Sequence, residues 1–191
     1  MSRPRRLRLI TVGITATIAL VSVALIVLLA SRGPASAITF QSPLLGQAAP
    51  KLMATNLSGG ATAAEHVISL KTAGDRPLVL NFFASWCAPC KAEASELNAF
   101  SYDQSLKPNG ARLVGVVFND ADNAARAFGK SEGVLYALVG DSGGVIASAY
   151  GVTSPPTSFL ISTSGKVVQA WVGPITASQL DKAVAAKGYS S

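Results

Sequence analysis

Two cysteines stand where an apolar run gives way to a helical pattern, and this arrangement constrains the fold more than any other feature. Cys87 and Cys90 are the only cysteines of the chain and lie three positions apart in the segment NFFASWCAPC. Residues 78–84 before them are nearly all apolar, as in a strand buried on both faces. Residues 89–100 after them have helical spacing. The sequence therefore predicts a strand that leads directly into a helix, with the cysteines at the junction.

This junction predicts different roles for the two sulfurs. At a helix N-terminus, unpaired N–H groups and the positive end of the helix dipole favour a thiolate, so Cys87 is the predicted nucleophile. Cys90 lies one turn further in, on the more buried side, and is the predicted resolving cysteine. Pro89 falls in the first helical turn, where it stiffens the loop between the sulfurs. Trp86 places a flat apolar face beside the sulfur.

Other uses of two cysteines fit the sequence less well. A four-ligand zinc site is disfavoured because there is no second CxxC, and the sole histidine, His66, lies upstream without ligand spacing. A purely structural disulfide is disfavoured because closing so small a loop removes little chain entropy. We therefore predict redox chemistry carried by the thiols themselves, with no metal and no cofactor.

The basic charge of the chain is confined to its N-terminus. The formal net charge is +6, but five of the sixteen basic residues precede position 33, namely Arg3, Arg5, Arg6, Arg8 and Arg32. The remainder of the chain has eleven basic residues against ten acidic ones. No basic face is left to follow a phosphate backbone, so we expect no nucleic-acid partner.

The N-terminal segment has the pattern of a membrane anchor. Residues 9–30 are uncharged, and 22 residues in a helix can cross a hydrocarbon core. The arginines before this run predict a cytoplasmic tip, with the rest of the chain outside the cytoplasm at the cell membrane. Alternatively, cleavage after the small residues 35–37, near Ala37, would release a secreted protein. We predict a tip and anchor over residues 1–32, a linker over 33–49 and one domain over 50–191.

Strands and helices alternate along this domain. Two short strands around the glycines at 59 and 60 predict a hairpin before the main sheet. Further strands and helices follow the cysteine-bearing helix, and a second hairpin turns at 163–165. The predicted strands are 51–57, 66–70, 78–84, 112–118, 135–139, 157–162 and 166–172, and the predicted helices are 89–100, 121–130, 145–150 and 176–187.

Residues from about 45 to 187 resemble the extracytoplasmic, membrane-tethered thioredoxin-like proteins of the TlpA, ResA and CcmG group. The resemblance rests on VLNFFASWCAPCKAE, on YGVTSPPTSFLIS some 65 residues later, and on GKVV after the second hairpin turn. It implies an α/β, thioredoxin-like three-layer fold, in which helices flank a central mixed sheet and an extra β-hairpin precedes it.

The resemblance also implies roles for residues outside the CxxC. Pro156 takes the place of the group's cis-proline, whose loop offers backbone groups to a substrate chain, although an ordinary trans proline at a strand entrance fits the sequence too. Glu93 matches an acidic position that tunes the cysteines in this group; alternatively it is a solvated glutamate in a helix's first turns. Asn81 stands where thioredoxins place a buried aspartate, which leaves Glu93 as the candidate proton acceptor for Cys90.

Pro155 departs from the pattern expected at the substrate loop. The residue before the cis-proline usually donates to and accepts from a bound peptide, but Pro155 has no N–H and can only accept. We therefore expect weaker or more selective capture of substrate than in close relatives.

The predicted function is an extracytoplasmic disulfide reductase that acts as a monomer. The resemblance implies clients such as apocytochrome c, and a thiol electron donor in the membrane must re-reduce the CxxC. A disulfide-forming oxidase on the same fold and a metal-binding or scaffold module stay open as alternatives. A peroxiredoxin is disfavoured because Ala84 stands three residues before Cys87, where peroxide chemistry needs a threonine or serine.

Overall fold

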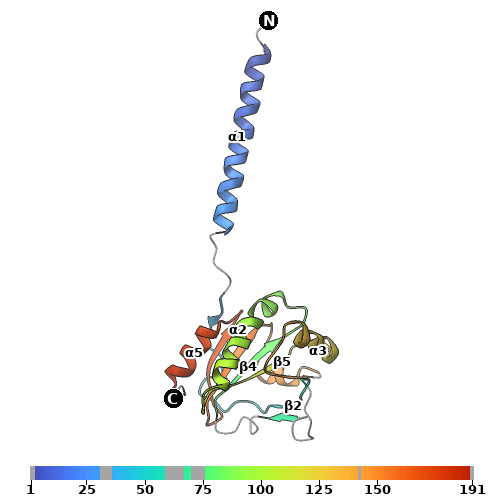
Figure 1. The fold of residues 1–191 in the computed structure, drawn as a ribbon, viewed down its shortest axis with the longest axis vertical. Coiled ribbons are helices and arrows are strands. Elements are labelled where there is room, and N and C mark those ends of the chain that lie inside the picture. The colour runs from blue at the N-terminus through green and yellow to red at the C-terminus, as the bar shows by residue number, and fades with distance from the viewer. Residues whose placement is uncertain (1–2, 31–35, 59–66, 70–75, 142, 190–191) are drawn as a thin grey trace. The chain divides into compact units, whose positions relative to one another are not determined.

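The computed structural model describes residues 3–30, 36–58, 67–69, 76–141 and 143–189 (Figure 1). They fall in two compact units, Met1–Ala35 and Ser36–Ser191. The described residues of the first unit form one helix, α1 (Arg3–Ala30). Within the part of the chain that the structure describes, no helix combines the length and the apolar character needed to cross a membrane.

The second unit is built on a six-stranded mixed sheet with the order β1-β8-β7-β4-β5-β6 (Figure 1). Strands β4, β5 and β6 are parallel, and β7 runs antiparallel to both β4 and β8. A short edge strand, β1, pairs with β8. The strands span Ile38–Thr39 (β1), Leu78–Phe83 (β4), Arg112–Val117 (β5), Ala137–Val139 (β6), Thr157–Ile161 (β7) and Val167–Val172 (β8).

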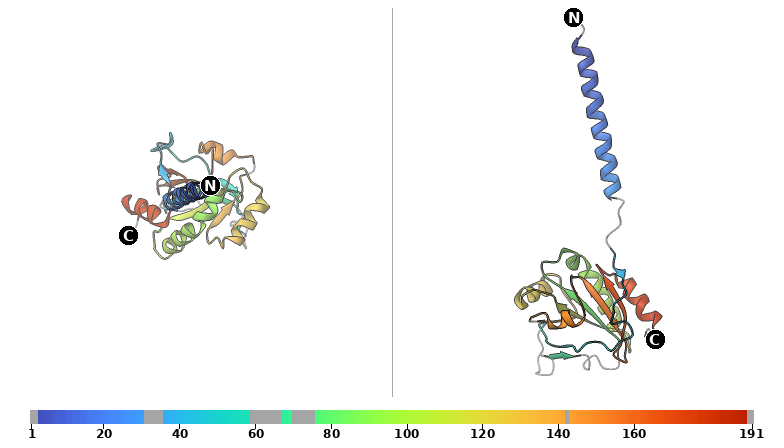
Figure 2. Two further views of the ribbon diagram at one scale, coloured as in Figure 1. Left: turned by 90° about the horizontal axis from the view of Figure 1, so that it is seen from above. Right: turned by 180° about the vertical axis from the view of Figure 1, so that it is seen from behind.

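Helices cover both faces of this sheet and make three layers (Figure 2). Helices α2 (Ala88–Ser105), α3 (Asp122–Ser131) and α5 (Ala177–Ala186) pack on one face. The short α4 (Val145–Ala149) packs on the other face, together with Leu52 and Ala54. Burial of each large apolar side chain stabilises the fold by about 1.5–3 kcal/mol. The largest of these, Phe82, Phe83, Phe100 and Phe159, are at most 2% exposed.

The central strand β4 positions the site. Its six residues are all buried, and side chains alternate between the two faces of a strand. Val79 and Phe83 contribute to the core beneath α2, whereas Leu80 and Phe82 contribute to the opposite core. Asn81 therefore lies on the α2 face, as the only polar side chain of the strand.

The structure confirms the predicted thioredoxin-like fold and the hairpin that precedes the main sheet. Strand β2 (Met53–Thr55) pairs antiparallel with β3 (Val67–Ser69). The predicted turn glycines at 59 and 60 and His66 lie outside the described residues, as does Ala35 of the predicted cleavage motif. The strands and helices predicted beyond residue 78 are all present, with ends shifted by a few residues.

The segment for which the sequence predicted a linker carries structure along the edge of the sheet. Strand β1 pairs with the end of β8, and the N–H of Gly46 donates to the carbonyl of Val167 at 2.8 Å. An unpaired edge strand exposes a row of backbone donors and acceptors, and this segment covers that edge of β8. A strand of two residues has no periodicity from which it could be predicted.

Candidate active site

The cysteines lie at the junction that the sequence predicts. Strand β4 ends at Phe83, and α2 begins at Ala88 with Cys87 as its N-cap. The Cys87 Sγ accepts a hydrogen bond from the N–H of Cys90 at 3.1 Å. Pro89 occupies the first turn of α2, where its missing N–H leaves no helical hydrogen bond unmade. The helix N-terminus therefore directs backbone donors at the Cys87 sulfur.

The two sulfurs form a disulfide. The Cα atoms of Cys87 and Cys90 are 5.2 Å apart, within the range that a disulfide bridges without backbone movement. Cys87 is 4% exposed and Cys90 1%, so the small accessible part of the pair belongs mainly to Cys87. Both cysteines are therefore buried, Cys90 more fully than Cys87. Trp86, directly before Cys87, is 57% exposed.

The Pro155–Pro156 peptide bond is cis, as expected from the resemblance. Strands β4 and β7 are antiparallel, with Phe82 opposite Thr157 and Asn81 opposite Ser158. This register brings the start of β7, and so Pro156, to the end of β4 from which the cysteine loop leaves. The Pro156 carbonyl accepts from the N–H of Gly173 at 2.9 Å, which ties the loop to the end of β8.

A buried carboxyl group lies one helical turn behind Cys90. Glu93 is 2% exposed, in contrast to the solvated glutamate that the sequence left open. One carboxylate oxygen, Oε1, accepts from Asn81 Nδ2 at 2.8 Å, and the other, Oε2, accepts from the N–H of Ile175 at 2.9 Å. Asn81 Nδ2 also donates to Ser158 Oγ at 3.1 Å. Residues i and i+3 of a helix are neighbours on its surface, so Glu93 and Cys90 share the inner face of α2.

Burial controls the ionisation of this group. Desolvation raises the pKa of Glu93 from 4.5 to about 7, against the smaller lowering effects of the hydrogen bonds from Ile175 and Asn81. Burial, and next the charge of Glu93, raise the pKa of Tyr136, which faces the carboxyl from the segment before β6. Glu93 is therefore poised to exchange a proton near neutral pH, as a general acid or base requires.

The loop after β5, which the sequence did not predict as part of the site, contacts the segment just before the cysteines. The Asp120 carboxylate accepts from the N–H of Ser85 at 2.7 Å, and the Asn119 carbonyl accepts from Trp86 Nε1 at 3.3 Å. Asn119 is the one non-glycine residue with positive φ, at 45°, in the described part of the chain. Asparagine tolerates this conformation better than most residues, and such positions concentrate at functional sites. These contacts fix Trp86 beside Cys87.

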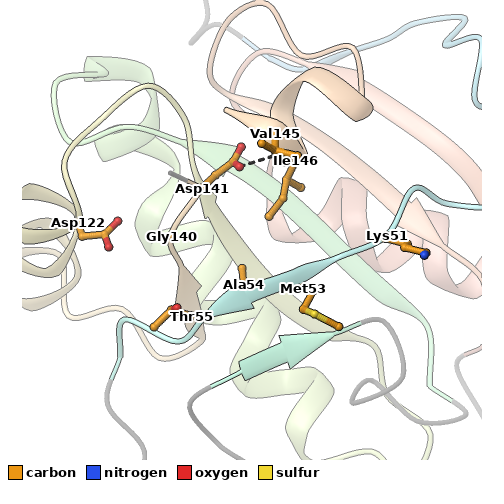
Figure 3. Close-up of a pocket in the computed structure, with 9 residues that line it drawn as sticks. All are labelled: Lys51, Met53, Ala54, Thr55, Asp122, Gly140, Asp141, Val145 and Ile146. Carbon is orange, nitrogen blue, oxygen red and sulfur yellow. Dashed lines mark hydrogen bonds between the residues drawn. The ribbon is translucent and has the colours of Figure 1, made fainter. Parts of the chain in front are cut away.

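A hollow of about 510 Å³ lies apart from the cysteines, at the carboxyl end of β6 (Figure 3). The carboxylate of Asp141, one of its lining residues, accepts from the N–H groups of Ile146 and Ala147 at 2.9 and 2.8 Å and so caps α4. Nowhere in the described residues do three His, Cys, Asp or Glu side chains converge as metal ligands would. The lining residues are Lys51, Met53, Ala54, Thr55, Asp122, Gly140, Asp141, Val145 and Ile146.

Comparison with known proteins places this geometry in a family. Residues 45–170 match the model of the AhpC/TSA family. The chain belongs to this family. It is 33% identical over 138 residues to the thiol-disulfide oxidoreductase ResA of Bacillus thuringiensis subsp. konkukian, covering 72% of this chain and 75% of the relative. It is 32% identical over 157 residues to the thiol:disulfide interchange protein DsbE homolog of Paracoccus denitrificans, covering 76% and 80%.

A solved structure supports the same assignment. The crystal structure of a thiol:disulfide interchange protein DsbE from Chlorobium tepidum superposes with a TM-score of 0.63 and 27% identity, covering 73% of this chain and 94% of that one. The predicted group and the predicted class, a thiol-disulfide redox enzyme, are confirmed by these relatives. Such enzymes act on proteins that carry disulfides, so disulfide-bearing clients are the partners of this family.

Proposed function

We propose that this protein is an extracytoplasmic disulfide reductase that is tethered to the membrane and acts on client proteins such as apocytochrome c. The observation that carries the proposal is the Cys87–Cys90 pair at the N-terminus of α2, with a buried carboxyl group one turn behind it. The greater exposure of Cys87 than of Cys90, 4% against 1%, supports Cys87 as the residue that attacks first.

In the first step, the Cys87 thiolate of the reduced protein attacks one sulfur of the client disulfide. A bond forms between Cys87 and that sulfur, and the other client sulfur leaves as a thiolate. In the second step, the Cys90 thiol gives its proton to Glu93 and attacks the Cys87 sulfur. The intermolecular bond breaks, the second client thiol is released, and the Cys87–Cys90 disulfide remains.

The surrounding residues serve this exchange. Backbone N–H groups of α2 stabilise negative charge on Cys87, and Pro89 limits the freedom of the loop between the cysteines. Trp86 supplies apolar contact area for the client. The Pro155 carbonyl accepts a hydrogen bond from the client chain and holds it in an extended form next to Cys87, in the manner of strand addition. A thiol donor in the membrane then returns two electrons to the disulfide.

Residues 9–30 anchor the protein, and the domain lies outside the cytoplasm. The run is uncharged and follows four arginines, which favours a cytoplasmic N-terminus. Its described side chains, residues 14–28, are all exposed and mostly apolar, as suits a helix in lipid. A tether keeps the reductase at the surface where cytochrome assembly takes place.

Trapping tests the proposed function. With Cys90→Ser, the second step cannot occur, so the client stays attached to Cys87 and is identified by mass spectrometry after isolation from membranes. The double variant Cys87→Ser, Cys90→Ser is the matched control. Apocytochrome c recovered with Cys90→Ser but not with the double variant supports the proposal. Recovery of other disulfide-bearing proteins and no apocytochrome c rejects apocytochrome c as the client. A reduction potential as oxidising as that of disulfide-forming enzymes would instead identify an oxidase.

A further inference from the structure

The buried cluster around Glu93 contains one polar atom with no partner. Asn81 is fully buried, and its two amide hydrogens are used by Glu93 Oε1 and Ser158 Oγ. Its Oδ1 is the only buried side-chain nitrogen or oxygen without a hydrogen-bond partner among the residues that the structure describes. Leaving a buried acceptor unsatisfied costs about 1–3 kcal/mol, so its retention beside a titrating carboxyl group indicates a use.

That use follows from the symmetry of the amide. A half-turn about the last side-chain bond exchanges Oδ1 and Nδ2. Oδ1 would then face Glu93 Oε1 and Ser158 Oγ, and Nδ2 would take the position where Oδ1 has no partner, a cost that the new hydrogen bonds to Oδ1 must offset. The Ser158 hydroxyl can donate to it as well as accept from it. Glu93 can donate to it only when the carboxyl carries a proton; an ionised carboxylate would place two acceptors against each other. The amide orientation is therefore coupled to the proton on Glu93.

We propose that Asn81 and Ser158 are positioning residues that fix Glu93 as the proton acceptor for Cys90, with the Asn81 amide turning over when Glu93 takes up the proton. The proposal rests on the proposed function and deepens it. In the ionised state, Asn81 donates to the carboxylate and keeps it ready to accept. When Cys90 gives up its proton, Oδ1 turns to accept from the new carboxylic acid, which holds the proton while the Cys90 thiolate attacks Cys87.

The other groups that face Glu93 are compatible with this switch. The N–H of Ile175, from the segment before α5, donates to Oε2 in both states. Tyr136 faces it from the segment before β6, and its raised pKa keeps the phenol neutral. Cys90 lies on α2 itself. Among the contacts of the described residues, the Asn81 amide can change between donor and acceptor at Oε1, and the Ser158 hydroxyl can change with it at the other amide contact, so the coupling is assigned to these two residues.

The experiment is a pH titration of the full-length protein in detergent micelles. The protein is kept oxidised, so that neither cysteine titrates. The ¹³Cδ resonance of Glu93 and the side-chain amide resonances of Asn81 are followed by NMR. For the unmodified protein we expect a common midpoint near pH 7. Ser158→Ala frees the amide and raises the Glu93 midpoint by about one unit, and Asn81→Leu removes the donor and raises it by about one to two units. Ser158→Thr, which keeps a hydroxyl, restores the original midpoint.

Ser162→Ala is the matched control, since it removes a buried hydroxyl just beyond the end of β7 that bonds Ser164 and the N–H of Lys166. Its Glu93 midpoint should not move. In the reduced protein, release of a synthetic disulfide peptide from Cys87 should slow about fivefold at pH 7 in Ser158→Ala, the fall in ionised Glu93 for a one-unit shift, and recover above about pH 9.

The inference would be overturned if the Asn81 amide resonances do not change at the pH where Glu93 titrates. It would also be overturned if the Glu93 midpoint is unchanged in both Ser158→Ala and Asn81→Leu. These outcomes are separate from the fate of the proposed function. The titration uses no client and no activity, whereas the proposed function fails if the unmodified reduced protein leaves the peptide disulfide intact.

Discussion

The buried carboxyl of Glu93 should make the stability of the fold depend on pH, and Glu93→Gln should remove this dependence. The pKa of Glu93 is about 7 in the folded protein, above its ordinary value of 4.5. A raised folded pKa means that the folded state binds the proton more tightly than the unfolded chain. The contribution is therefore most favourable below about pH 4.5 and is lost as the pH rises through 7.

The size of the effect follows from the shift. One pKa unit corresponds to about 1.36 kcal/mol, so a shift of about 2.5 units changes the free energy of unfolding by roughly 3 kcal/mol between about pH 4 and pH 8. Glu93 is 2% exposed, so solvent screening does not reduce this figure much. Most of the change should occur between about pH 5 and pH 7.

The assay is urea denaturation of the oxidised protein across this range. A glutamine side chain cannot accept from both Asn81 and Ile175, so Glu93→Gln has a cost of its own, but that cost does not vary with pH. The measured quantity is therefore the difference in pH dependence between the variant and the original protein. Glu96→Gln, an exposed change one turn along α2, serves as the control. Parallel stability curves for Glu93→Gln and the unmodified protein would refute the assignment of a buried, proton-binding Glu93.

Three further outcomes are expected. Thr176→Ala removes the capping box of α5 and should lower the free energy of unfolding by about 1 kcal/mol, measured by urea denaturation, with Ser131→Ala as a control. Pro155→Ala restores an N–H at the client loop and, in the Cys90→Ser background, should shift the thiol-disulfide exchange equilibrium with a peptide toward the mixed disulfide on Cys87; an unchanged equilibrium would count against a peptide contact there. The protein should show no peroxidase turnover with hydrogen peroxide, because Ala84 supplies no hydroxyl three residues before Cys87, and a rate comparable with disulfide reduction would contradict this reading.

The cysteine junction was predictable because its signals are local. An apolar strand, two cysteines and a helical pattern follow one another within about twenty residues, and the structure places Cys87 as the N-cap of α2. The main strands were predictable for the same reason, since each is an almost continuous apolar run. The short β1 was not predictable, because two residues have no hydrophobic periodicity. Its position depends on pairing with the otherwise open edge of β8.

The partners of Glu93 depend on contacts that are distant in sequence. Ser158 lies 77 residues from Asn81, and Ile175 lies 82 residues from Glu93. A signal for the first contact does exist in the sequence: Asn81 and Ser158 are polar residues inside strands whose neighbours are apolar, and buried polar groups need partners. Their adjacency then follows from the register of β4 and β7.

The contacts of Asn119 and Asp120 have no comparable signal. Both residues read as ordinary turn formers after β5, and their role depends on how closely that turn approaches Ser85 and Trp86. The positive φ of Asn119 is visible only in the structure. Contacts of this kind, made by a loop that follows a neighbouring strand, could therefore not be predicted from the sequence.

Single-turnover reaction of the reduced protein with a disulfide peptide tests the central claim most directly, with the products mapped by mass spectrometry. We predict one reduced peptide for each Cys87–Cys90 disulfide formed, a stable peptide adduct on Cys87 in Cys90→Ser, and no adduct on Cys90 in Cys87→Ser. An adduct that forms equally well on Cys90, or peptide reduction that survives the loss of Cys87, would contradict the account.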